Sequence, residues 1–277
     1  MTRESVQARI GVALDEVERR EGVRILLAVE SGSRAWGFAS RDSDYDVRFL
    51  FVRPLPGYLA IAPPSDVIER PLQDELDLGG WDLRKALGLM MRSNAVAMEW
   101  LASPMVYRQD AGLSAALRSV AHAGAYLPAL AYHYDRVARS ALVRGVDGEI
   151  GLKACFYALR PVLALLWMRE HASPPPMHME ALLAGVAVPD EVRRAVEALR
   201  LRKAAGTEAD AVTCPPVLEA FLATALALRP PRPGTWGREE ARARADTLFR
   251  KVVLDRNVGR GPGLPLTIRN KALGIGS

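Results

Sequence analysis

The stretch that decides the fold is ESGSRAWGFASRDSDYDVRFLFV, which occupies residues 30–52. It directly follows a short apolar run, Val23 to Val29, whose branched residues are typical of a buried strand. Within the stretch, residues 31–34 predict a turn, 35–38 a brief helix and 47–52 a second strand. The sequence therefore predicts a strand, a turn opening a short helix, and another strand, with polar residues gathered at the bends.

Two sets of polar residues in this stretch point to chemistry. Gly32 and Ser33 open the brief helix, where backbone N–H groups, a hydroxyl and the positive helix end can hold phosphate oxygens. Asp44 and Asp46 stand two apart at the start of the second strand, so alternation places both carboxylates on one face. Such a pair can share a hard divalent cation such as Mg²⁺. The alternative is a polar turn followed by an exposed strand residue, but the combination favours a nucleotide and metal site.

A metal site of this kind needs a third carboxylate from a neighbouring strand. We favour Asp77, because Leu76 and Leu78 flank it in a strand-like run and its side chain should face away from theirs. The alternatives are Asp74, Glu75 and Asp82. Asp82 follows Gly79 and Gly80 near the predicted start of a helix, where capping favours an acidic residue without any catalytic task.

Other side chains are candidates for nucleotide binding. Arg34 follows the Gly-Ser turn and could face a triphosphate or pair with Asp42, and Ser43 lies in the same loop. The side chains of a later predicted helix that share one face, four and then three positions apart, are Lys153, Tyr157 and Arg160. Trp36 and Phe38 could stack on a base, but an aromatic pair in a short helix after a strand is more typical of a core.

The rest of the chain changes rhythm near residue 126. Before it, strands are expected at 66–72, 75–78 and 104–107, and the Gly79-Gly80 pair is expected to end the second of these. Helices are expected to start near residues 81, 95 and 111. After it, helices are predicted at 132–143, 151–170, 191–203, 217–228 and 239–254. The sequence thus predicts two domains, 1–125 and a helical domain at 126–277, whose tail from Gly259 is expected to be partly mobile.

Composition sets the outer limits of these predictions. The 277 residues carry 37 Lys plus Arg against 32 Asp plus Glu, a net charge of +5, which permits a phosphate-rich partner without requiring one. No apolar run approaches the roughly 18 residues of a membrane span, and the first residues are polar, so we expect a cytoplasmic protein with no membrane partner. Cys155 and Cys214 lie 59 positions apart without ligand spacing, and we expect two thiols in a reducing compartment.

The pattern of Gly32, Ser33, Asp44, Asp46 and Asp77 resembles the DNA polymerase beta-like nucleotidyltransferase superfamily. More narrowly, residues 32–38, 43–49, 81–87 and 99–107 look like the predicted nucleotidyltransferases associated with RNA repair and RNA ligase. The resemblance implies an α+β fold, with a mixed sheet flanked by helices and a helical C-terminal lobe.

The same resemblance implies a reaction. It is metal-dependent transfer of a nucleoside monophosphate from an NTP to an acceptor hydroxyl with release of pyrophosphate, two Mg²⁺ or Mn²⁺ ions being held by Asp44, Asp46 and Asp77. An RNA end is the expected acceptor. The alternatives are a protein or small-molecule acceptor, or a non-catalytic nucleotide-binding or antitoxin-like module, and the sequence leaves the oligomeric state open.

Overall fold

The computed structural model describes residues 3–73, 75–143, 150–205, 213–228 and 238–255. The described strands are β1 (Arg24–Glu30), β2 (Tyr45–Val52), β3 (Val67–Gln73), β4 (Leu76–Asp82) and β5 (Val106–Gln109). They form one sheet in the order β3-β4-β2-β1-β5, in which β2 and β4 are parallel and the other neighbouring pairs are antiparallel. The sheet is therefore mixed, as the resemblance implied.

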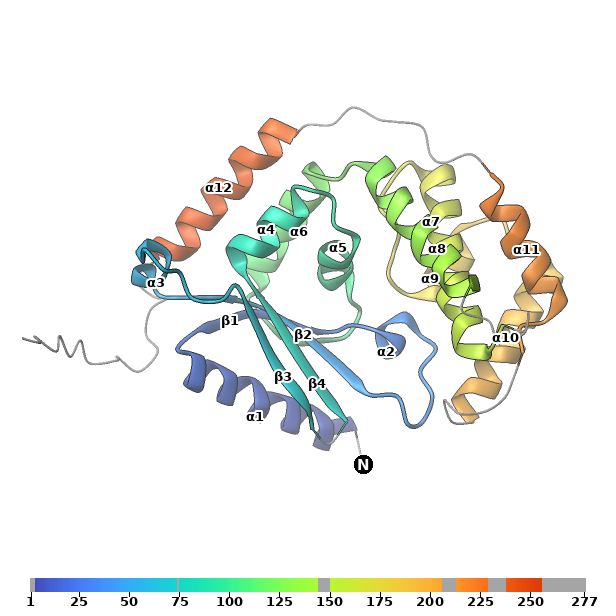
Figure 1. The fold of residues 1–277 in the computed structure, drawn as a ribbon, viewed down its shortest axis with the longest axis horizontal. Coiled ribbons are helices and arrows are strands. Elements are labelled where there is room, and N and C mark those ends of the chain that lie inside the picture. Colours follow the sequence, from blue (N-terminus) through green and yellow to red (C-terminus); the bar gives the residue numbers. More distant parts are fainter. Residues whose placement is uncertain (1–2, 74, 144–149, 206–212, 229–237, 256–277) are drawn as a thin grey trace, which may run out of the picture.

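Helices cover both faces of this sheet because its central strands are apolar on both sides (Figure 1). Helix α1 (Arg3–Glu21) packs against the face that carries Phe49 and Phe51. The opposite face, which carries Leu50 and Val52, is covered by α4 (Leu83–Met90), α5 (Ala95–Ala102) and α6 (Ala111–Ala123). Successive side chains of β2 thus point alternately into two separate cores, and the middle of the sheet is buried on both faces.

The second half of the chain forms a helical lobe with its own core. Its helices are α7 (Leu127–Val143), α8 (Leu152–His171), α9 (Met179–Gly185), α10 (Asp190–Ala205) and α11 (Pro216–Leu226). Helix α8 supplies the largest share of that core, with Phe156, Leu159 and Val162 fully buried. The fold class is accordingly α+β, a sheet-bearing half followed by a helical lobe.

The last described helix, α12 (Arg238–Leu254), leaves this lobe and packs on α4 and α6 of the sheet-bearing half (Figure 1). Its Ala245 and Val252 are buried in the same core as Leu50. The division into 1–125 and 126–277 stays a prediction, and the predicted mobile tail from Gly259 lies outside the described residues.

Several local predictions were wrong. Strand β4 does not break at Gly79 and Gly80 but continues to Asp82, paired with β2 on one side and β3 on the other. Two short helices went unpredicted, α9 and α3 (Leu55–Leu59), because neither is long enough for a helical period to stand out.

The expectation of two thiols was also wrong, because Cys155 and Cys214 form a disulfide, with Cα atoms 5.6 Å apart. The segment before α11 returns to the start of α8, where the Cys214 N–H donates to the Ile150 carbonyl at 2.7 Å and Thr213 bridges to Gly151. The sequence alone did not predict this disulfide, because the two cysteines are 59 positions apart and only tertiary packing brings them together.

Candidate functional site

The two carboxylates predicted on neighbouring strands lie side by side. Strands β2 and β4 run parallel in a register that places Asp46 directly opposite Asp77, and both side chains are partly exposed, at 32% and 40%. Asp44 is exposed just before β2 begins, and its charge helps to raise the pKa of Asp46. The three acidic residues therefore lie toward the same end of the two central strands.

One alternative third carboxylate, Asp74, lies outside the described residues, and another, Asp82, has a structural task. It is 4% exposed and caps α4, accepting the Arg84 N–H at 2.8 Å and the Tyr58 hydroxyl at 2.7 Å. Both bonds engage its carboxylate away from Asp46, at the far end of β4. The geometry thus favours Asp77 as the third acidic residue of the site.

An arginine that the sequence analysis did not single out lies between the paired carboxylates. The Arg48 guanidinium lies 2.6 Å from Asp77 Oδ2 and 3.3 Å from Asp46 Oδ1, and it also donates to the Asp77 carbonyl at 2.9 Å. In this arrangement no group of three His, Cys, Asp or Glu among the described residues is gathered closely enough to hold a metal ion. The guanidinium stands where a cation would be attracted, and carboxylate oxygens are the donors that Mg²⁺ and Mn²⁺ prefer.

Asp46 also connects the site to the helical lobe. Burial is the largest cause of its raised pKa, opposed first by the Arg48 charge, while the charges of Asp77 and Asp44 raise it further. The ammonium group of Lys153 is close enough to lower it. Lys153 stands in the first turn of α8, so its charge acts on Asp46 from the helical lobe.

The predicted phosphate turn touches the same aspartate. Gly32 has a φ of +106°, and a Cβ at this position would lie 2.2 Å from Asp46 Oδ2. The neighbouring Ser31 N–H donates to the Asp46 carbonyl at 2.8 Å. Ser33 then starts the short helix α2 (Ser33–Trp36). Glycine is required at position 32 by both the backbone conformation and the close approach of the carboxylate.

Arg34 and Ser43 hold the loop that leads into β2. The Arg34 guanidinium stacks over the Tyr45 ring at 3.9 Å and donates to the carbonyls of Asp44, at 3.1 Å, and Ser43. The Ser43 hydroxyl is buried, accepts the Ser40 N–H at 3.0 Å and lies 2.8 Å from the Ser40 hydroxyl. These contacts orient Asp44 and use the Ser43 side chain inside its own loop rather than toward a ligand.

The predicted stripe on α8 divides into two parts. Lys153 is exposed, and Tyr157 packs against Trp36 in a T-shaped arrangement with ring centroids 5.4 Å apart. Arg160 is 5% exposed, pairs with Glu99 at 2.8 Å and donates to the Met177 carbonyl at 3.0 Å. The sequence-based role of Arg160 in nucleotide binding is therefore not supported, because these partners engage the guanidinium inside the protein.

The aromatic pair beside the phosphate turn belongs to the core, as expected. Phe38 is 2% exposed and stacks on Phe156 with centroids 4.9 Å apart, and Trp36 lies against Tyr157 and the Arg160 guanidinium. These contacts fasten α2, and with it the phosphate turn, to α8.

A buried glutamate that the sequence analysis passed over lies beneath the site. Glu30 ends β1 with no exposed surface, and its carboxylate accepts the Asp46 N–H at 2.9 Å and the Tyr107 hydroxyl. Burial raises the pKa of Glu30 from 4.5 to about 7, while the two hydrogen bonds oppose that rise. An acidic residue closing an apolar strand was the available signal, since a buried carboxylate needs specific partners.

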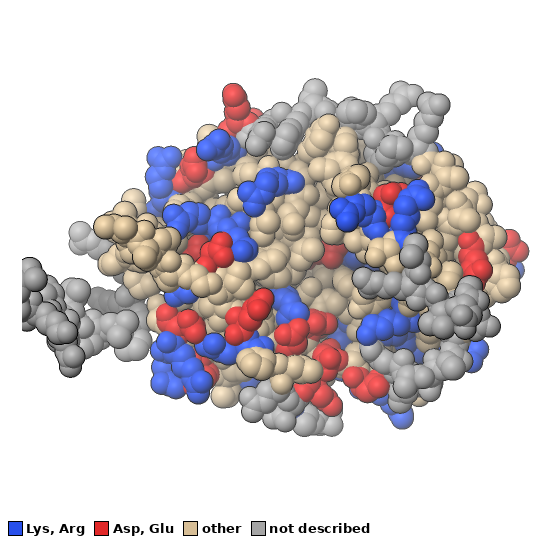
Figure 2. All heavy atoms as spheres, viewed as in Figure 1, with Lys and Arg blue, Asp and Glu red and all other residues tan. Residues whose placement is uncertain are grey.

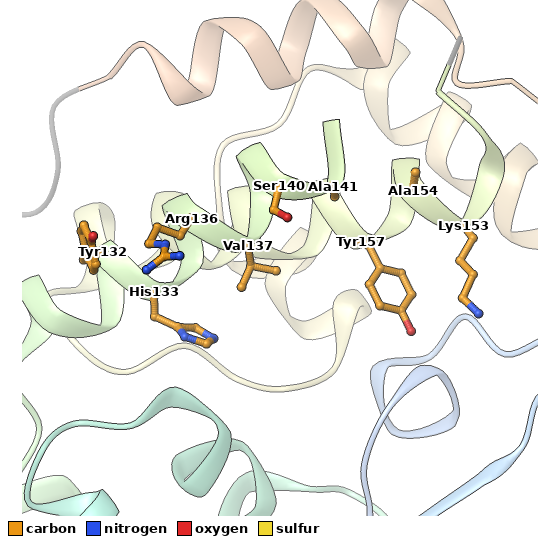
Figure 3. Close-up of a pocket in the computed structure, with 9 residues that line it drawn as sticks. All are labelled: Tyr132, His133, Arg136, Val137, Ser140, Ala141, Lys153, Ala154 and Tyr157. Carbon is orange, nitrogen blue, oxygen red and sulfur yellow. The ribbon is translucent and has the colours of Figure 1, made fainter. Parts of the chain in front are cut away.

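A groove between α7 and α8 opens beside Lys153 and has a volume of about 660 Å³. The side chains that line it are Tyr132, His133, Arg136, Val137, Ser140, Ala141, Lys153, Ala154 and Tyr157 (Figure 3). Lys153 and Tyr157 lie at one end of this row and Tyr132 at the other. Over the sheet-bearing half, Figure 2 shows acidic and basic side chains intermingled.

A mixed sheet whose parallel strands present paired aspartates beside a Gly-Ser turn defines the class as a polymerase beta-like protein. The chain belongs to the RlaP family, described as the RNA repair pathway DNA polymerase beta family, whose model matches residues 6–251. It is also 40% identical over 222 residues to the uncharacterized protein YcgL of Bacillus subtilis (strain 168), a match covering 80% of this chain and 85% of that protein. Among the described helices, none combines the length and apolar character needed to cross a membrane.

Proposed function

We propose that this protein is a metal-dependent nucleotidyltransferase that moves a nucleoside monophosphate from an NTP to the terminal hydroxyl of an RNA. The observation that carries the proposal is the position of Asp46, opposite Asp77 across β2 and β4 and against the turn at Gly32. This position puts a candidate cation site and a candidate phosphate site in direct contact. Membership of a family named for RNA repair supports the choice of acceptor.

Asp44, Asp46 and Asp77 would hold the divalent cations, Mg²⁺ or Mn²⁺, with two ions expected. The cations would supply charge neutralisation at the triphosphate and a lowered pKa for the attacking hydroxyl. The Arg48 guanidinium contacts both carboxylates and so balances part of the negative charge of Asp46 and Asp77. Asp77 would complete the cation site or accept the proton of the acceptor hydroxyl.

The phosphates would lie between the sheet and the helical lobe. The N–H groups at the Gly32-Ser33 turn and the Lys153 ammonium group bring positive charge to the triphosphate from the two halves of the molecule. The acceptor hydroxyl gives its proton to Asp77 or to water, and its oxygen forms a bond to the α phosphorus. The bond from that phosphorus to the bridging oxygen breaks, and pyrophosphate leaves with the electron pair. Positioning and charge neutralisation supply most of the acceleration in such displacements.

The test is transfer of label from each α-labelled NTP to a pool of RNA, protein and small-molecule acceptors, with Mg²⁺ or Mn²⁺ present. We expect labelled RNA with the natural protein and at least about a 100-fold loss in D46N and D77N, a size typical for removal of groups that stabilise the transition state. The control is D66N, because Asp66 is 60% exposed on its surface pair with Lys85.

Three results would count against the proposal. Full activity in D46N would show that the assigned site is wrong. Label found in a protein or a small molecule would show that the acceptor is not RNA. Absence of any labelled product, together with no metal-dependent NTP binding, would leave a non-catalytic nucleotide-binding module. Circular dichroism of each variant separates loss of chemistry from loss of fold.

A further inference from the structure

The groove between α7 and α8 contains two pairs of an aromatic ring and a cation. The Arg136 guanidinium carbon lies 5.9 Å from the centroid of the Tyr132 ring, and Lys153 Nζ lies 6.0 Å from the centroid of Tyr157. All four side chains line the same space of about 660 Å³. The groove therefore repeats one chemical arrangement at its two ends (Figure 3).

The lining has the charge of a site for anions. Its cations are Arg136 and Lys153, and none of its nine residues is Asp or Glu. Val137, Ala141 and Ala154 add apolar surface to the lining. Tyr132 leaves 65% of its surface exposed, so its ring is available to a ligand that can cover it. A ligand with both flat apolar rings and negative charge matches this surface.

We propose that the α7–α8 groove binds the single-stranded end of an RNA acceptor, with bases on the rings of Tyr132 and Tyr157 and phosphodiesters beside Arg136 and Lys153. This inference rests on the proposed function, because Lys153, at one end of the groove, is close enough for its charge to act on Asp46, where transfer would occur. The strand would enter at Tyr132 and direct its terminal hydroxyl toward Asp46 and Asp77.

The two rings toward opposite ends of the groove favour a strand, which offers a base to each ring, over a lone nucleotide, which offers one base. Tyr132 and Ala141, nine positions apart on α7, are separated by about 14 Å at about 1.5 Å per residue. Aromatic rings that bind single strands take successive bases by stacking, and every base offers such a face. In a duplex the bases are stacked inside and the rings could not reach them. An acidic protein segment would satisfy the cations but would leave the two rings without matching partners.

The experiment measures binding of a fluorescently labelled six-nucleotide RNA by anisotropy, in EDTA so that metal sites do not contribute. We expect Y132A to weaken binding about 5-fold to 100-fold, the range typical of one lost base–aromatic stack. R136Q should weaken binding and also reduce the salt dependence, since about 0.7 of a counterion is released per phosphate contact on a single strand. A blunt duplex of the same sequence should bind more weakly than the single strand.

The matched control is R200Q, which removes one positive charge from the exposed Arg200–Glu197 pair on α10. Its RNA affinity should equal that of the natural protein. The inference is overturned if Y132A and R136Q bind RNA as tightly as R200Q, if the duplex binds better, or if both variants weaken ATP binding as much as RNA binding. In the last case the groove would hold the nucleotide.

The two proposals fail separately. If the natural protein shows no transferase activity but Y132A still weakens single-strand binding, the proposed function is wrong and the proposed RNA groove is supported. If the natural protein transfers label to RNA but neither Y132A nor R136Q changes RNA affinity, the proposed groove is wrong and the proposed function is supported.

Discussion

Gly32 shows how one missing Cβ shapes the site. Its φ of +106° is a conformation that residues with a side chain rarely adopt, and the Asp46 carboxylate occupies the space where a Cβ would be. The phosphate turn and the aspartate can therefore approach each other because position 32 has no side chain.

Replacement of Gly32 by alanine should disturb both the turn and the aspartate. We expect G32A to lose about 1–3 kcal/mol of unfolding free energy from backbone strain and to lose most transferase activity. The control is G11A, since no atom lies within 4 Å of a Cβ there and Gly11 lies inside α1. It should gain up to about 1 kcal/mol from helix propensity. Urea unfolding of both variants checks this, and equal stabilities would contradict the assigned strain.

Glu30 carries a cost that its position imposes. Its carboxylate holds the Asp46 N–H and the Tyr107 hydroxyl, yet burial raises its pKa to about 7 because the charged form loses contact with water. Between about pH 4.5 and pH 7 the folded protein binds more protons at this residue than the unfolded chain. Stability from this residue must therefore fall as pH rises through that window and stay constant above it.

The variant E30Q should lose this pH dependence, because glutamine stays neutral and keeps the side-chain shape. We expect the unfolding free energy of E30Q relative to the natural protein to increase from pH 4.5 to pH 7, by up to about 3 kcal/mol. Urea unfolding in EDTA across this range measures the difference. Parallel pH profiles for the two proteins would refute the buried-carboxylate explanation.

At the scale of elements, β4 explains why a pair of glycines did not end a strand. A Cβ at Gly80 would lie 2.1 Å from Phe49 Cε2, and Phe49 is fully buried in the core beneath α1. Gly80 thus makes room for a ring on the neighbouring strand while hydrogen bonds to β2 and β3 continue. Glycine usually weakens or ends a strand, but here tertiary packing requires it within one.

This explanation predicts different effects for the two glycines. G80A should cost about 1–3 kcal/mol, since the added methyl must displace a packed ring. G79A should change stability by less than about 0.5 kcal/mol, because a Cβ there meets Arg48 Cδ at an ordinary 3.6 Å. Thermal unfolding of the pair decides the matter, and a G80A variant as stable as G79A would show that the space beside Phe49 does not require a glycine.

At the scale of the whole molecule, a buried ion pair joins the two halves. Arg160 of α8 pairs with Glu99 of α5 at 2.8 Å, and the Tyr134 hydroxyl of α7 donates to the same carboxylate at 2.8 Å. Both charged side chains are nearly covered, at 6% and 11% exposure. Since the groove lies on α7 and α8 and the acidic residues lie on the sheet, this pair helps to set the distance between them.

Breaking the pair should destabilise the protein strongly. We expect R160M to cost about 3–5 kcal/mol, because Glu99 would remain buried without its partner. The double variant R160M/E99L should recover part of that loss, and R200Q, on an exposed pair, should cost at most about 1 kcal/mol. Chemical unfolding of the natural protein, R160M, E99L and the double variant measures the coupling. A double variant whose loss is simply the sum of the two single losses would show that the pair is not coupled.

Much of the local structure followed from the sequence because its causes are local. The helical spacing of Val6, Ile10, Leu14 and Val17 predicted α1, and all four side chains are buried. The apolar run before Glu30 and the one after Asp46 predicted β1 and β2. The two-residue spacing of Asp44 and Asp46, and the alternation around Asp77, likewise depend on neighbours in the chain.

Only the tertiary structure decided which of these residues meet. The parallel pairing of β2 with β4 placed Asp77 opposite Asp46, and packing of α8 buried Arg160 and brought Lys153 within range for its charge to act on Asp46. The disulfide between Cys155 and Cys214, and the return of α12 to the sheet-bearing half, depend on contacts between distant segments. Periodicity reports which face of an element is apolar, but the partner of that face is chosen by the packing of the whole chain.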